Sequence, residues 1–83
     1  MYLHPGGNCV LRTDDIIGIF DLDKTTVSKR TRAFLNEKEK QNKVVLLDDD
    51  LPQSFIVTAT GKEEKVYLSQ ISSKTLYMRL SEE

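Results

Sequence analysis

The chain has one cysteine, one histidine and no tryptophan among its 83 residues. A single cysteine cannot form an internal disulfide, and no Cys/His set has the spacing of a metal site. The longest apolar run, Val44 to Leu47, is far too short to span a membrane. Residues 1–5 have neither the charged start nor the apolar stretch of a secretory signal. We therefore expect a cytoplasmic protein with no cofactor, no metal and no membrane partner.

The length predicts one domain over residues 1–83. A chain this short buries only about 60–65% of the surface that its unfolded form exposes, which leaves modest stability. Small domains in this position often gain stability from disulfides, a metal or oligomerisation. Since the first two are excluded, we expect a homo-oligomer, with a well-packed monomer as the alternative.

Candidate catalytic residues are few and isolated. His4 has no serine or cysteine beside it in a recognisable motif, whereas nucleophilic catalysis needs a nucleophile, a base and an orienting group. Cys9 sits in a strand pattern, where free cysteine is usually a small buried hydrophobe. The carboxylates of Asp48–Asp50 are consecutive and lack the spacing of a calcium loop, so we interpret them as a solvated acidic loop. We expect no enzyme activity and no small-molecule substrate.

Patterns of β-branched and apolar residues between turn signals predict strands. They fall at residues 2–4, 9–12, 16–20, 44–47, 54–60 and 66–69. The first two strands flank a turn at Pro5–Asn8, and the last two flank a loop at 61–65, so each pair is expected to form a hairpin. The strand at 16–20 is apolar on both faces and is expected to be largely buried, and Gly18 indicates a bulge or a close backbone approach. The strand at 44–47 is also expected to be buried.

One long helix is predicted from Thr26 to about Gln41. Asp23 or Thr25 can cap its start, and Asn42 can end it because asparagine tolerates the left-handed conformation. One side carries an apolar stripe at helical spacing. Its members are Val27, Thr31, Phe34 and Leu35.

A short closing helix is predicted over residues 74–80, capped by Ser72 or Ser73, with Leu76 and Leu80 on one face. The order of elements indicates an α+β fold, with a small antiparallel or mixed curved sheet, one long helix and a short C-terminal helix. The residues expected in the core are Ile16, Ile19, Phe20, Val45, Ile56 and Val57.

The charges are unevenly distributed. Residues 24–43 carry seven basic and two acidic side chains, a charge of +5, and the rest carries five basic and eleven acidic ones, a charge of −6. Within the basic segment, four polar side chains recur at spacings of three and four residues and line one helix face: Lys29, Arg32, Asn36 and Lys40. Such a row can lie along a phosphate backbone. The alternative is an ordinary solvated face, and Tyr67 and Tyr77 are not interleaved for base stacking.

Several segments together resemble a known family. They are residues 1–4 with Gly6, the Thr-Asp-Asp-Ile-Ile-Gly-Ile-Phe-Asp stretch at 13–21, Phe34-Leu35, residues 43–45 and the stretch from Tyr67 to Leu76. This pattern, which covers nearly the whole chain, is similar to the RemA/RemB family of bacterial extracellular-matrix (biofilm) regulators, in particular to its RemB branch. The resemblance implies a small domain that assembles into rings. In the RemA branch it implies a transcription activator that wraps DNA around the ring.

The chain departs from the family pattern at one position. RemA-type proteins carry a DNA-binding, arginine-rich loop just before the strand that here begins near Phe55. The matching stretch of this chain, residues 50–54, has no arginine and follows two further aspartates. Those DNA-contacting residues therefore do not carry over.

Two hypotheses follow. The first is an oligomeric transcription regulator that binds double-stranded DNA through its basic helix, repeated around a ring, because repetition strengthens weak contacts. The expected DNA-contacting residues are Lys29, Arg30, Arg32, Lys38 and Lys40. The second is a ring-forming structural or protein-interaction member that does not bind DNA, and the acidic loop favours it.

Overall fold

The computed structural model describes residues 1–22 and 28–81. The elements run in the order β1 (Tyr2–Gly6), β2 (Cys9–Arg12), η1 (Thr13–Asp15), β3 (Ile16–Asp21), α1 (Lys29–Lys40), β4 (Val44–Leu46), β5 (Ser54–Thr60), β6 (Glu63–Ser69) and α2 (Ser73–Ser81). The fold is a small α+β fold, as the sequence predicts.

The strands form two sheets. β1 and β2 make an antiparallel hairpin, which confirms the predicted N-terminal pairing. The other four strands make one mixed sheet in the order β3-β5-β6-β4, in which β5 is antiparallel to β3 and β6 while β4 is parallel to β6. β3 and β4 are therefore the two edges of the larger sheet.

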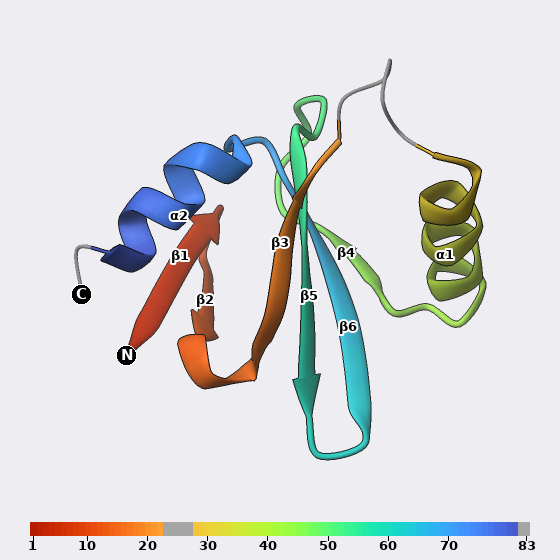
Figure 1. Cartoon of the computed structure of the whole chain (residues 1–83), viewed down its shortest axis with the longest axis horizontal. Coiled ribbons are helices and arrows are strands. Elements are labelled where there is room, and N and C mark those ends of the chain that lie inside the picture. Colours follow the sequence, from red (N-terminus) through yellow and green to blue (C-terminus); the bar gives the residue numbers. More distant parts are fainter. Residues whose placement is uncertain (23–27, 82–83) are drawn as a thin grey trace.

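The two faces of this sheet have different covers (Figure 1). The β1–β2 hairpin and α2 lie on one side, and α1 lies on the other. Side chains alternate between the faces along β5. Ile56 joins a core cluster with Leu3 and Leu11 of the hairpin and Leu76 of α2. Its neighbours Phe55 and Val57 form the second cluster with Val66, against which Phe34 and Leu35 of α1 pack.

Hydrogen bonds to backbone carbonyls join the hairpin and α2 to the sheet. The buried Ser69 hydroxyl donates to the carbonyl oxygen of Pro5 at 2.5 Å. The Tyr77 hydroxyl donates to the carbonyl oxygen of Ile19 at 3.0 Å, and Arg79 donates to that of His4 at 2.8 Å. The first two bonds join the hairpin and α2 to the large sheet, and the third joins α2 to β1.

Helix α1 begins later than the sequence predicts. Ser28 is extended, and its hydroxyl accepts a hydrogen bond from the backbone amide of Thr31 at 3.2 Å. Ser28 is thus the N-cap, and the predicted start at Thr26 is wrong. The predicted caps Asp23 and Thr25 and the stripe residue Val27 lie outside the described residues. The predicted end is confirmed, because Asn42 has a φ of 59°.

The closing helix agrees closely with its prediction. The Ser72 hydroxyl accepts a hydrogen bond from the backbone amide of Thr75 at 3.2 Å, so Ser72 caps α2. Leu76 is buried and Leu80 packs beside it against the core. The β5–β6 hairpin is tighter than predicted, because its strands continue to Thr60 and Glu63 and leave a two-residue turn.

Burial of the two edge strands is less than predicted. Ile17 and Phe20 of β3 are 62% and 46% exposed, so the expectations that β3 is largely buried and that Phe20 is core are wrong. Val45 of β4 is only half-buried and Leu46 is exposed. Edge strands have a neighbour on one side only, and α1 packs on β4 and β6 rather than on β3.

The rest of the predicted core is largely confirmed. Ile19, Ile56 and Val57 are buried, and Ile16 is half-buried against the first core cluster.

Candidate nucleic-acid interface

Helix α1 has an inner and an outer face. Phe34 and Leu35 lie on the inner face, where they pack against the second core cluster. The predicted row lies on the outer face, and each of its members is exposed: Lys29, Arg32, Asn36 and Lys40. Over residues 29–40 the row runs along the whole helix, which gives it the extended shape that a phosphate backbone requires.

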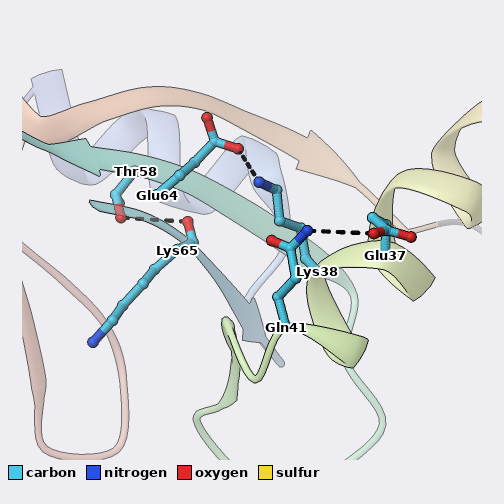
Figure 2. A network of polar contacts seen from close by, with 6 residues as sticks. All are labelled: Glu37, Lys38, Gln41, Thr58, Glu64 and Lys65. Atoms are coloured by element: carbon cyan, nitrogen blue, oxygen red, sulfur yellow. Dashed lines mark hydrogen bonds and ion pairs between the residues drawn. The ribbon is translucent and has the colours of Figure 1, made fainter. Parts of the chain in front are cut away.

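The basic side chains of this row make no ion pair within residues 1–22 and 28–81, where the ion pairs are Arg12–Asp14 and Lys38–Glu64. The acidic residues Glu37 and Glu39 flank the row on α1. Glu37 accepts a hydrogen bond from the Gln41 side chain at 3.4 Å (Figure 2). The row therefore presents positive charge to solvent, bordered by one carboxylate on each side.

Lys38 lies on the opposite face from this row. Its Nζ atom is 2.5 Å from Oε1 of Glu64 on β6 (Figure 2). The same atom is 5.7 Å from the centre of the Phe34 ring. Nine residues separate it from Lys29, which at about 100° per residue is a rotation of about 180°. The structure thus places Lys38 between helix and sheet, away from the basic residues of the row.

Arg30 lies on the flank of the row and lines a groove between α1 and the sheet. The groove has a volume of about 430 Å³. Its lining is mostly apolar, includes two charged residues and comes from four elements, β3, β5, β6 and α1. The lining residues are Ile17, Phe20, Phe55, Val57, Phe34, Thr31, Arg30 and Glu64. Sequence analysis missed this groove, because the apolar residues on both faces of β3 indicate a buried central strand, whereas β3 is an edge strand.

Gly18 lies against the ring of Phe20, one of the residues that line the groove. The strand pairing shifts register between Ile16 and Gly18, which confirms the predicted bulge. The Phe20 ring folds back over Gly18, since a Cβ atom there would lie 2.6 Å from the ring carbon Cζ. The ring also stacks on Phe55, with centroids 5.0 Å apart and planes inclined by 24°. The two rings form a continuous apolar surface that remains partly open to solvent.

The other residues considered in the sequence analysis are Cys9, His4 and Asp48–Asp50. Burial raises the pKa of the Cys9 thiol above its ordinary value, and Cys9 packs against the first core cluster. His4 is exposed, and its backbone carbonyl accepts the bond from Arg79. Asp48 accepts a hydrogen bond from the backbone amide of Asp50 at 3.3 Å, so this carboxylate stabilises its own loop. Within the described ranges, no cluster of three His, Cys, Asp or Glu side chains could hold a metal ion.

No helix in the described part of the chain is both long and apolar enough to cross a membrane. The structure is a small α+β fold with two exposed surface features, a basic helix face and an apolar groove.

Comparison with known proteins identifies the family. The model of the RemA-like family, described as extracellular matrix regulatory protein A-like, matches residues 2–80. The chain is also 39% identical over 79 residues to extracellular matrix regulatory protein B of Bacillus subtilis, an alignment that covers 95% of this chain and 89% of that protein. The chain belongs to the RemA-like family of bacterial extracellular matrix regulators.

Proposed function

We propose that this protein is a DNA-associated transcription regulator of extracellular matrix genes, which assembles into a homo-oligomeric ring and binds DNA phosphates through α1. The observation that carries the proposal is the exposed row on α1, whose cations Lys29, Arg32 and Lys40 make no ion pair within the described residues. The regulatory names of the family support it.

The chemistry of the row favours backbone contacts over base reading. Lysine and arginine on one exposed helix face neutralise phosphates, which position a protein on the duplex without reading its sequence. Three cations per subunit bind weakly. A ring presents the same row several times to one duplex, and each further contact then forms at high effective concentration.

Lys38 is left out of the proposed contact because its charge is paired with Glu64. Arg30 is at most peripheral, because its side chain borders the apolar groove. The proposed DNA-contacting residues are therefore Lys29, Arg32 and Lys40, with Asn36 between them.

The test is a DNA-binding titration on protein whose assembly state is known, at several salt concentrations. Affinity should fall steeply with salt, because each neutralised phosphate releases condensed counterions. The double variant Lys29→Glu/Arg32→Glu should lose binding and keep its assembly, since both side chains are exposed. A matched control, Lys62→Glu/Lys65→Glu, makes the same charge change at exposed positions on the β5–β6 hairpin. This control should lose much less affinity for DNA.

A second candidate function is assembly without DNA. The acidic loop favours it, because Asp48–Asp50 stand beside the position where the resemblance implies arginines that bind DNA. Wild-type protein that assembles but fails to bind duplex DNA even at low salt supports this second function. Loss of assembly in the Lys29→Glu/Arg32→Glu variant contradicts the proposed role of the row and makes it a contact between subunits.

A further inference from the structure

The groove between α1 and the large sheet has apolar walls that are open to solvent. Helix α1 packs mainly on β4 and β6, so it covers little of the β3 surface on this face. Ile17 and Phe20 are 62% and 46% exposed there, and Phe55 and Val57 line the groove with them. Continuous apolar surface rimmed by polar residues is typical of a binding site.

The volume of the groove, about 430 Å³, is that of a small-molecule site. Such sites measure about 300–1,000 Å³, and their mostly hydrophobic and aromatic walls carry a few polar groups that fix the orientation of the ligand. Three phenylalanines supply the aromatic walls here, and two of them, Phe20 and Phe55, stack on each other. A volume toward the lower end of this range suits a small molecule with one apolar body.

The polar residues that line the groove leave one charge uncompensated, and that charge is positive. Glu64 is already paired with Lys38. The Thr31 hydroxyl is uncharged and lies 3.1 Å from the hydroxyl of Ser28. Arg30 is exposed and makes no ion pair within the described residues. Charge complementarity therefore selects a ligand that carries an anionic group beside Arg30.

The position of Arg30 in the helix adds to this preference. Lys29 and Arg30 begin α1, and its first turn has no acidic residue. The N-terminal end of a helix carries a partial positive charge, which is unfavourable beside cations and favourable beside a carboxylate. An anion bound at Arg30 offsets both of these positive charges.

We propose that the groove binds a small amphipathic carboxylic acid, whose apolar body lies against Ile17 and the stacked Phe20 and Phe55 and whose carboxylate pairs with Arg30. A guanidinium group offers parallel N–H donors to a carboxylate, so this contact fixes the orientation of the ligand. The apolar body supplies affinity through the surface that it removes from water. Such a ligand site goes beyond the proposed function, because it binds without DNA and does not use the exposed row of α1.

The test is isothermal titration calorimetry without DNA, on the protein in its own assembly state, with three probes of equal chain length. Octanoate has the apolar body and the carboxylate, 1-octanol lacks the charge, and octylammonium reverses it. Octanoate should bind about tenfold more tightly than 1-octanol, which is the gain expected from charge-assisted hydrogen bonds. Octylammonium should bind most weakly, because its charge repels Arg30.

Variants at exposed positions separate the two parts of the site. Arg30→Gln should lose the preference for octanoate and keep its affinity for 1-octanol, whereas Arg30→Lys should retain part of the preference. Ile17→Asn should weaken the binding of both probes by a similar factor. The matched control Arg12→Gln removes an exposed guanidinium group on the other side of the sheet and should bind octanoate as the wild type does (Figure 1). Because all three side chains are exposed, circular dichroism should show an intact fold in each variant.

The proposal is overturned if octanoate and 1-octanol bind the wild type equally, or if Arg30→Gln keeps the preference for octanoate, because Arg30 then does not select an anion. Wild-type protein that binds none of the probes overturns it as well. Octanoate that binds only at dilutions where sedimentation shows the assembly to be dissociated means that a neighbouring subunit occupies the groove, and the ligand site is then wrong.

Discussion

Lys38 of α1 and Glu64 of β6 form an ion pair with a separation of 2.5 Å between Nζ and Oε1. The Lys38 side chain is only 16% exposed, and its ammonium group also lies over the Phe34 ring. The pair joins the inner face of the helix to the sheet (Figure 2). Lys38 therefore contributes to helix docking, whereas Lys29, Arg32 and Lys40 remain available to bind an anion.

The first prediction separates these two roles. Lys38→Gln should lower the free energy of unfolding by about 1 kcal/mol, the upper range for an ion pair that is partly exposed. It should leave the salt dependence of DNA binding unchanged. The control Lys29→Gln should leave stability within about 0.5 kcal/mol of the wild type and weaken DNA binding. Urea unfolding and fluorescence anisotropy measure the two effects. The reverse pattern would show that Lys38 contacts DNA.

The row on α1 could be predicted because helical periodicity is a local property. A rotation of about 100° per residue places Lys29 and Lys40 on the exposed face of the helix and Phe34 on the face that packs against the sheet. The same arithmetic places Lys38 on the inner face, so its position could have been found from the sequence. Its partner Glu64 could not have been identified from the sequence, because that pairing depends on where β6 lies in the sheet.

The groove could not be predicted from local patterns. Ile16–Phe20 is apolar on both faces and therefore indicates a central strand. Whether a strand is central or at an edge depends on the order of strands in the sheet, and here β3 is an edge. The coverage of β3 also depends on where α1 docks, which the strand's own residues do not specify.

The second prediction compares two isoleucines of β3. Ile19 is 4% exposed in the first core cluster, so Ile19→Ala should lower the free energy of unfolding by about 2–4 kcal/mol. Ile17→Ala, at an exposed position two residues away, should cost less than about 1 kcal/mol in the isolated subunit. Chemical denaturation at low protein concentration measures both. Equal losses at the two positions would contradict the observed facing of β3.

The third prediction concerns Gly18. A methyl group at this position would collide with the Phe20 ring, which must then swing away from Phe55. Gly18→Ala should cost about 1–2 kcal/mol of stability, as overpacking does. In a Phe20→Ala background the same change should cost much less, because the colliding ring is absent. A double-mutant cycle by urea unfolding gives the coupling. Additive effects would show that the ring does not restrict Gly18.

The fourth prediction is a loss of stability at alkaline pH. Burial raises the pKa of the Cys9 thiol above its ordinary value of 9.0. Burial first, and then the charges of Cys9 and Asp15, raise the pKa of Tyr67 above its ordinary value of 10.0. Because the folded state holds both protons more tightly, its stability is complete below these ordinary values and falls as pH rises through the folded-state values. Urea unfolding should show this decline, and Cys9→Ala and Tyr67→Phe should each reduce it.

The last prediction tests how the acidic loop acts on DNA. Asp49 and Asp50 are exposed, and their negative charges oppose the approach of a phosphate backbone at any distance within the Debye length. The Asp49→Asn/Asp50→Asn variant should therefore bind DNA as well as the wild type or more tightly, with the largest gain at low salt. Asp48 is left in place because its carboxylate accepts the bond that holds the loop. The control Glu63→Gln removes one exposed negative charge from β6 and should change affinity less. Anisotropy titrations at several salt concentrations compare the three proteins, with assembly checked by sedimentation. Weaker binding by the loop variant alone, with its assembly intact, would mean that these aspartates support DNA binding, and the repulsive role of the loop would be wrong.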